Sequence, residues 1–94
     1  MAVPDRDTVL VVSSKFRLQW EPAQQAYVLL YAEGMIKLNS SAAEVLKRLD
    51  GTRTLAAVID DLQRQFPKAA VANDVKEFVK VAHDQGWISF KQPA

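Results

Sequence analysis

Few residues of this chain have side chains that could carry out catalysis. The 94 residues contain no cysteine and a single histidine, His83, so there is no thiol nucleophile and there are too few ligands for a zinc or iron site. Asp60 and Asp61 form an acidic pair, but adjacent residues of a helix point about 100° apart and do not converge on one substrate atom. We therefore predict no catalytic residue, no metal site and no cofactor, and we expect the acidic pair to lie on a solvated helix face.

Two serines and the histidine have structural explanations. Ser40 and Ser41 precede a helical pattern with no histidine near them in sequence, and serine at this place caps a helix by accepting hydrogen bonds from backbone N–H groups. Ser41 and Glu44 also have the spacing of a capping box. His83 falls in the last turn of another predicted helix, where a positive charge is favourable. The three glycines are isolated and form no phosphate-binding loop.

The composition is typical of one small folded domain. Hydrophobic residues make up 49% of the chain and charged residues 24%, and the formal net charge is +1. The charges are mixed in sign, so attraction for nucleic acid is weak. The longest apolar stretch, residues 26–32, is far shorter than the roughly 20 residues that cross a bilayer. The N-terminus MAVPDRD lacks the apolar region of a secretory signal. We expect a cytoplasmic protein that binds neither nucleic acid nor membranes.

Three predicted strands form the first half of the domain. Apolar and polar residues alternate from Lys15 to Trp20, which predicts a strand with one buried face. Residues 26–32 are apolar on both faces, as in a central strand, and residues 35–38 form a short third strand after the turn at Glu33-Gly34. Two successive hairpins predict an antiparallel meander whose third strand lies at the edge of the sheet.

Three helices are predicted to follow the strands. The first begins at residues 39–41 and ends at Gly51, since glycine readily adopts the left-handed conformation of a helix C-terminus. Thr54 caps the second helix, which Pro67 ends, and Gly86 ends the third. Each helix has one apolar stripe with helical spacing: Ala42, Val45, Leu46 and Leu49 in the first; Leu55, Val58, Ile59, Leu62 and Phe66 in the second; Val71, Val75, Phe78, Val79 and Ala82 in the third.

The order of these elements predicts an α+β fold that resembles a winged-helix domain: a three-stranded antiparallel meander, three helices and a short C-terminal extended segment at residues 87–90, which is either a strand or a packed tail. We assign residues 15–90 to this domain and residues 91–94 to a C-terminal tail. Residues 1–14 contain the β-branched run Val9–Val12, which predicts either an extra strand or an arm that packs on a second copy. The second alternative would make the protein a homodimer.

An exposed strand edge offers a binding site without special side chains, because its unpaired N–H and C=O groups can pair with another chain. We expect an extended peptide to add to the third strand, held by apolar side chains of that strand and of the third helix. On this hypothesis Ile36→Pro weakens binding by removing an edge donor. The alternative assigns at least half of the predicted peptide-binding residues to the core: Met35, Ile36, Lys37, Leu38, Val75, Phe78, Val79 and Ala82.

A family resemblance begins at the end of the meander. The chain reads Leu38-Asn39, then Ala43-Glu44-Val45-Leu46, then Leu49-Asp50-Gly51 and Arg53-Thr54 before an amphipathic helix. These residues, in this order after a strand meander, resemble the PqqD family of pyrroloquinoline quinone (PQQ) biosynthesis. More broadly they are similar to the recognition elements of ribosomally made, modified peptides (RiPP recognition elements). The resemblance covers Lys15 to Phe90.

The resemblance implies a peptide chaperone that is not an enzyme. Members of the family bind the precursor peptide PqqA as an added strand and present it to the radical SAM enzyme PqqE, to which the iron–sulfur clusters and the carbon–carbon bond formation belong. The groove of the family corresponds here to residues 35–38 and the facing side of the third helix. The Val9–Val12 run is less typical of the family. Four residues match its motif, either as structural residues or as contacts to the enzyme: Asp50, Gly51, Arg53 and Thr54.

Two other functions stay open from the residues alone. The first is a winged-helix DNA-binding protein, although the charges of the third helix give it no one-sided basic face: Asp74, Lys76, Glu77, Lys80 and Asp84. The second is an enzyme or a carrier of PQQ itself, which would need polar groups that converge on a pocket. The available cations are scattered along the sequence: Arg17, Lys37, Arg48 and Arg53.

Overall fold

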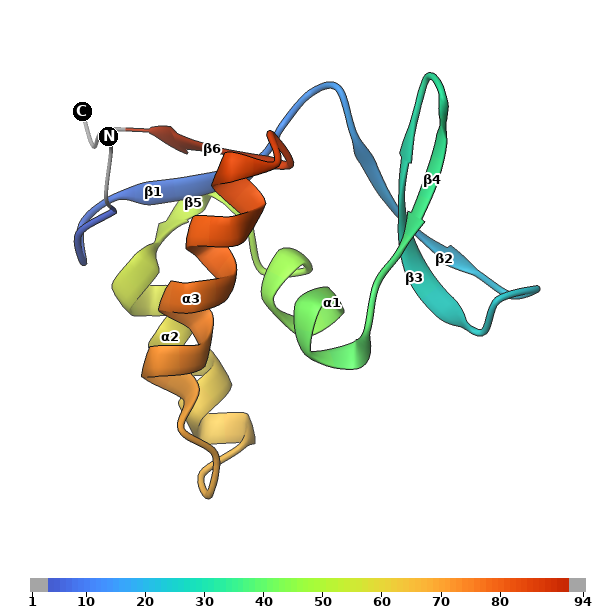
Figure 1. Ribbon diagram of the computed structural model, residues 1–94. Coiled ribbons are helices and arrows are strands. Elements are labelled where there is room, and N and C mark those ends of the chain that lie inside the picture. Colours follow the sequence, from blue (N-terminus) through green and yellow to red (C-terminus); the bar gives the residue numbers. More distant parts are fainter. Residues whose placement is uncertain (1–3, 92–94) are drawn as a thin grey trace.

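The computed structural model describes residues 4–91 of the chain. Residues 1–3 and 92–94 lie outside this range, so the predicted tail at residues 91–94 is described only at Lys91. Six strands and three helices make up the described part (Figure 1): β1 (Val9–Val12), β2 (Arg17–Glu21), β3 (Ala26–Tyr31), β4 (Gly34–Lys37), α1 (Ser40–Leu46), β5 (Asp50–Thr54), α2 (Leu55–Gln65), α3 (Val71–Asp84) and β6 (Ile88–Lys91).

β2, β3 and β4 form the predicted antiparallel meander, here called the meander sheet. The strand order is β2-β3-β4, which confirms that the third strand lies at an edge. The register pairs Leu29 with Leu18 on one side and with Ile36 on the other. These three side chains form a row across one face of the sheet, and all three pack in or against the hydrophobic core.

A second antiparallel sheet, here called the terminal sheet, was not predicted. Its strand order is β5-β1-β6, and Val9 pairs with Thr54 on one side and Lys91 on the other. Of the two predictions for Val9–Val12, the structure has the extra strand. The alternative of an arm on a second copy is wrong for this segment, because its own chain occupies both of its edges. The final extended segment is the strand β6.

α1 begins within the predicted residues 39–41 but ends earlier than predicted. Its N-cap is Asn39, whose side-chain oxygen accepts a hydrogen bond from the backbone N–H of Ala42 at 2.8 Å. The predicted capping box is wrong, since the Glu44 carboxylate instead accepts hydrogen bonds from Lys47 and Arg48. The helix ends at Leu46. Gly51 has the predicted left-handed conformation, with φ of +85°, but it lies in β5.

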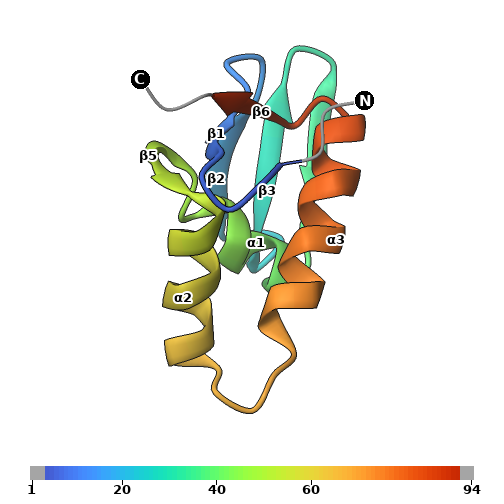
Figure 2. The same cartoon turned by 90° about the vertical axis from the view of Figure 1, so that its left-hand side faces the viewer.

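α2 and α3 follow the prediction more closely. The Thr54 side chain caps α2 by accepting a hydrogen bond from the N–H of Ala57, and Gly86 follows the end of α3 with φ of +79°. Phe66 lies just beyond α2 and is 43% exposed, so it leaves the predicted apolar stripe. Figure 2 shows α2 and α3 side by side, and Figure 1 shows α3 and β4 on opposite sides of α1. None of the helices in residues 4–91 has the length and apolar character that spanning a bilayer requires.

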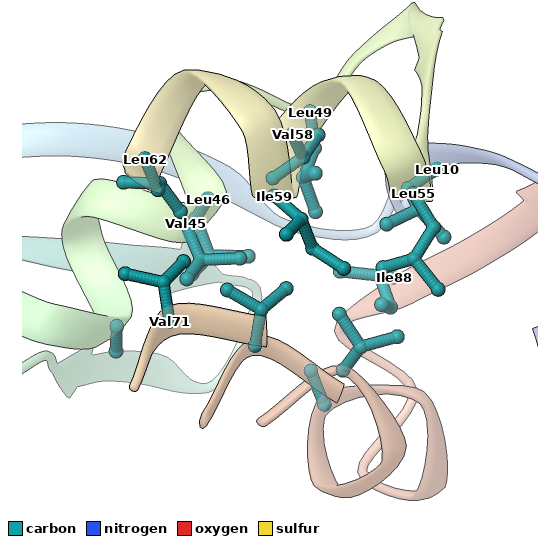
Figure 3. Close-up of a cluster of buried hydrophobic side chains, with 14 of the residues drawn as sticks. Leu10, Val45, Leu46, Leu49, Leu55, Val58, Ile59, Leu62, Val71 and Ile88 are labelled. Atoms are coloured by element: carbon teal, nitrogen blue, oxygen red, sulfur yellow. The ribbon is translucent and has the colours of Figure 1, made fainter. Parts of the chain in front are cut away.

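One hydrophobic core joins the helices to both sheets. Leu10 of β1 and Ile88 of β6 lie beside Leu55 of α2 (Figure 3), in one buried cluster with side chains of α1 and α3. Leu29 brings the meander sheet into the same cluster, and α1 lies between the two halves of the molecule in Figure 1. The α+β fold class is confirmed, whereas the likeness to winged-helix domains stays a prediction.

Candidate functional site

β4 has one edge that no strand of residues 4–91 occupies, because it pairs only with β3. The backbone N–H of Leu38, just after β4, donates to the carbonyl of Tyr27 at 2.9 Å. Successive residues of an antiparallel strand alternate between bonding to the partner strand and pointing away from it. Ile36 therefore bonds to β3, whereas the N–H and C=O groups of Met35 and Lys37 point to the open edge.

This alternation corrects the substitution proposed from the sequence. Proline at Ile36 would remove a hydrogen bond inside the meander sheet, so Ile36→Pro tests folding and does not remove an edge donor. The edge donors are the N–H groups of Met35 and Lys37, whose side chains are exposed. The Ile36 side chain is half-buried and packs against the core.

The structure divides the predicted peptide-binding residues into two groups. Four are buried in the core, each at most 5% exposed, and offer a guest almost no surface: Leu38, Val75, Val79 and Ala82. The others are at least partly accessible: Met35, Ile36, Lys37 and Phe78. The Phe78 ring packs against the core and lies 6.5 Å from the Trp87 ring, measured between centroids. The accessible group thus consists of β4 and one aromatic side chain of α3.

A hollow of about 560 Å³ adjoins the end of β4, a size within the range of about 300–1,000 Å³ found for ligand pockets. Asn39, two residues after β4, forms part of its wall, as does Val45 of α1. Leu62 and Phe66 contribute from the side of α2, and Phe78 from α3. β4 is therefore an open edge whose chain continues directly into the wall of a cavity.

The sequence did not predict that Phe66 forms part of the cavity wall. Helical spacing assigned Phe66 to the core stripe of α2, but a residue before proline is disfavoured in the helical conformation. Phe66 precedes Pro67 and has φ of −128° and ψ of 68°, so its ring is turned out of the stripe. Pro67 was the signal that could have found it, whereas nothing in the sequence places Asn39 beside Phe66.

The four residues of the family motif shape the start of α2. The Asp50 carboxylate accepts hydrogen bonds from the hydroxyl and the backbone N–H of Thr52, and these bonds lower the pKa of Asp50 below its ordinary value. Gly51 faces the Val11 side chain, and Thr54 caps α2. The Arg53 guanidinium lies 3.7 Å from the Asp61 carboxylate. Each motif residue has a structural role, and the enzyme contact stays a prediction.

Arg48 is buried and paired, in contrast to the prediction of scattered cations. Its Nε donates to the Asp61 carboxylate at 2.5 Å, and its Nη1 donates to the Glu44 carboxylate at 2.9 Å and to the Glu44 backbone carbonyl at 2.6 Å. The hydrogen bonds from Arg48 lower the pKa of Glu44 and of Asp61. Asp61 is therefore not a merely solvated residue, although Asp60 is exposed. This network ties α1 to α2.

His83 lies in the last turn of α3, as predicted, with its ring stacked on Phe90 at 4.0 Å between centroids. Within residues 4–91, no three side chains of the metal-binding types His, Cys, Asp and Glu are grouped as a metal ion would require. The candidate site thus consists of a backbone edge, an apolar flank and a cavity, which is an arrangement suited to binding an extended chain.

Two solved structures resemble this fold. The solution structure of the PqqD truncation of Methylobacterium extorquens PqqCD, described as a functional and stand-alone RiPP recognition element, aligns with a TM-score of 0.74. The alignment is 20% identical and covers 94% of this chain and 95% of that one. The heterocyclase TruD aligns with a TM-score of 0.69 at 16% identity, over 92% of this chain and 12% of that one. At these identities the likeness concerns the fold alone.

Relatives of much higher sequence identity carry the name PqqA binding protein. The relative from Pseudomonas paraeruginosa is 47% identical over 97% of this chain and all of its own length. The relative from Stutzerimonas stutzeri is 53% identical over 81% of this chain and 84% of its own length. The family model of coenzyme PQQ synthesis protein D (PqqD) matches residues 26–88. The chain therefore belongs to the PqqD family.

Proposed function

We propose that this protein binds the precursor peptide PqqA as an added strand on β4 and presents it to the radical SAM enzyme PqqE. The observation that carries the proposal is the open edge of β4, which continues into the wall of a cavity. The names of the relatives support PqqA as the guest. We expect this binding to occur in the cytoplasm, where PqqE would supply all the chemistry.

Backbone pairing orients the guest, and apolar contacts supply most of the affinity. The outward groups of Met35 and Lys37 form hydrogen bonds with the peptide backbone, each with a net gain of about 0.5–1.5 kcal/mol. Micromolar affinity corresponds to about −8 kcal/mol, so side chains must contribute the difference. Ile36 and Phe78 are half-buried and present apolar surface on the two flanks. The buried residues of α3 form the floor beneath the peptide and do not contact it directly.

The protein acts without catalysis in this proposal, and its exposed motif residues are candidates for the contact with PqqE. The side chains of Arg53 and Asp50 are 44% and 52% exposed, while the adjoining residues hold the turn before α2. The surface around this turn is formed by β5 and α2, away from the edge of β4. A peptide could therefore stay bound while the enzyme docks.

Lys37→Pro tests strand addition, and Lys37→Ala is the matched control. Both variants remove the lysine side chain, but only proline removes the outward N–H. We expect the lost hydrogen bond to make PqqA bind Lys37→Pro about 2- to 12-fold more weakly than Lys37→Ala. The proline ring should weaken binding further, because it stands where the peptide backbone would lie. Calorimetric titration with PqqA measures the affinities, and circular dichroism establishes that both variants fold.

Equal affinity of the two folded variants would show that the peptide does not add to β4. Amide shift changes on titration with PqqA should also concentrate on residues 34–39 and on the Phe78 side of α3.

Two further titrations address the other functions. Tight binding of a DNA duplex at low salt would favour a DNA-binding protein, and stoichiometric binding of free PQQ in dialysis would favour a carrier of the quinone.

A further inference from the structure

The hollow beyond β4 has mostly apolar walls. Aliphatic side chains of all three helices line it, together with the exposed ring of Phe66 and the half-buried ring of Phe78. Its floor includes Val45, Leu62 and Val75, which the core holds in place. Burying apolar surface here is favourable by about 25 cal/mol per Å². A guest side chain that binds in the hollow would therefore need a long hydrocarbon portion to cover these walls.

The charged residues that line the hollow are of one sign. Its lining includes the carboxylates of Glu44 and Asp74 and no lysine, arginine or histidine. Glu44 is already neutralised, because Lys47 and Arg48 donate to its two oxygens. Asp74 is exposed in the first turn of α3, and within residues 4–91 its carboxylate forms no ion pair. The group left to meet a guest is therefore an anion above an apolar floor.

The hollow also lies within reach of a peptide on β4. A strand advances about 3.3 Å per residue, and Asn39 at the wall follows Lys37 by two residues. A peptide that pairs with Met35 and Lys37 therefore arrives at the cavity within a few residues of the paired segment. Its next side chains then lie close enough to enter the cavity.

We propose that this hollow is a side-chain pocket for a lysine or arginine of the bound peptide, located just outside the segment that pairs with β4. The inference rests on the proposed function and adds a specificity site to it. The alkyl stem packs mainly against the exposed ring of Phe66, above the buried floor of Val45 and Leu62, and the cationic head reaches Asp74. Long cationic side chains combine these two properties, since they bury their stems while keeping the charge at the rim.

Asp74→Asn tests the pocket, with Asp84→Asn as its matched control on the same helix. Asparagine keeps the shape of aspartate and removes the charge. Asp84 is an exposed residue at the other end of α3 and does not line the hollow. In calorimetric titrations with the PqqA peptide of the same organism, we expect Asp74→Asn to weaken binding about 3- to 5-fold, as for a partly exposed ion pair, and Asp84→Asn to change it little. The difference should shrink at high salt.

A double-mutant cycle then identifies the guest residue. Each lysine and arginine of PqqA is replaced in turn by norleucine, which keeps an alkyl stem and removes the charge. For one position, the loss caused by norleucine should disappear in the Asp74→Asn protein, because the two changes remove the same interaction. If Asp74→Asn behaves as Asp84→Asn does, or if no basic position couples to Asp74, the pocket does not select a cation and the inference is wrong.

Two outcomes separate this inference from the function on which it rests. If PqqA binds the unchanged protein and Lys37→Pro weakens that binding, while Asp74→Asn has no effect, only the cationic pocket fails. If PqqA does not bind the unchanged protein at all, the proposed function fails, and the pocket with it. A larger effect of Phe66→Ala than of Asp74→Asn, without coupling to a basic residue, would identify a purely apolar guest side chain and overturn the cationic assignment.

Discussion

Arg48 is a buried cation whose guanidinium donates three hydrogen bonds within the protein. It is only 8% exposed, and its guanidinium bonds to the Glu44 carboxylate, the Glu44 carbonyl and the Asp61 carboxylate. A buried cation is costly unless it is paired and hydrogen-bonded, and here both conditions are met. The bonds join the end of α1 to the middle of α2. Two walls of the hollow, one from each helix, are thereby fixed relative to each other.

The network predicts a specific loss of stability in acid. The pKa values of Glu44 and Asp61 are lowered in the folded protein by hydrogen bonds from Arg48. Such carboxylates stabilise the fold above their unfolded pKa values of about 4, and this contribution is lost as the pH falls through the folded values. We expect the free energy of unfolding to fall below about pH 5, and Arg48→Met to flatten this dependence. Denaturant titrations at several pH values between 7 and 3 measure the free energy of unfolding of both proteins.

Arg17→Met is the control for this experiment, because Arg17 is an exposed residue of β2 and forms no ion pair within residues 4–91. It should leave the acid dependence unchanged. An equally steep acid dependence in Arg48→Met would mean that other carboxylates govern it.

The sequence could not have predicted this network. Arg48 and Asp61 are 13 residues apart, and only the packing of α1 on α2 brings them together.

At the scale of the elements, local patterns sufficed for the meander and for two helices. Alternation, hairpin turns and the cap at Thr54 are properties of neighbouring residues, and the structure has the predicted strand, hairpins and cap. The alternation is wrong at its end, where Trp20 is 49% exposed. The terminal sheet has no such signature. β5 reads Asp-Gly-Thr-Arg-Thr, with no apolar alternation, and its pairing with β1 joins distant parts of the chain. The open edge of β4 was therefore predictable, whereas the cavity beside it depends on contacts that no local pattern encodes.

Gly51, the second residue of β5, has a backbone conformation that other residues rarely adopt. Its φ is +85°, and an added Cβ would lie 3.4 Å from the Val11 side chain. We expect Gly51→Ala to destabilise the protein by about 1–2 kcal/mol, the cost of a left-handed conformation for an L-residue. Gly51→Asn should cost less, because asparagine tolerates this region better. The midpoints of urea unfolding compare the two variants.

Equal stability of Gly51→Ala and the unchanged protein would mean that the turn relaxes to another conformation. In that case the pairing of β1 with β5 should be examined directly by amide hydrogen exchange. Slow exchange in β5 of the alanine variant would show that the sheet tolerates the relaxed turn.

At the scale of the whole molecule, the two sheets share one core and should unfold together. Leu10 and Ile88 from the terminal sheet and Leu29 from the meander sheet belong to the same buried cluster. Leu29→Ala removes a fully buried side chain, and we expect it to cost about 2–5 kcal/mol. The loss should be felt equally in both sheets, because a shared core couples them into one transition.

The two tryptophans allow this to be measured sheet by sheet. Trp20 lies in β2 and Trp87 precedes β6. The variant Trp87→Phe keeps only Trp20, whose fluorescence reports on the meander sheet. The variant Trp20→Phe keeps only Trp87, whose fluorescence reports on the terminal sheet. In both backgrounds Leu29→Ala should lower the urea midpoint by the same amount. If only the Trp20 signal shifts, the meander sheet unfolds separately and the shared core does not couple the halves.

The central place of β1 in its sheet also sets the timing of biosynthetic folding. Residues 9–12 emerge from the ribosome early, but one of their two partners is the strand at residues 88–91. Closing so long a loop is entropically costly and slow. During translation the segment at residues 9–12 therefore stays without this neighbour, and the domain can reach its native topology only after residues 88–91 have been synthesised.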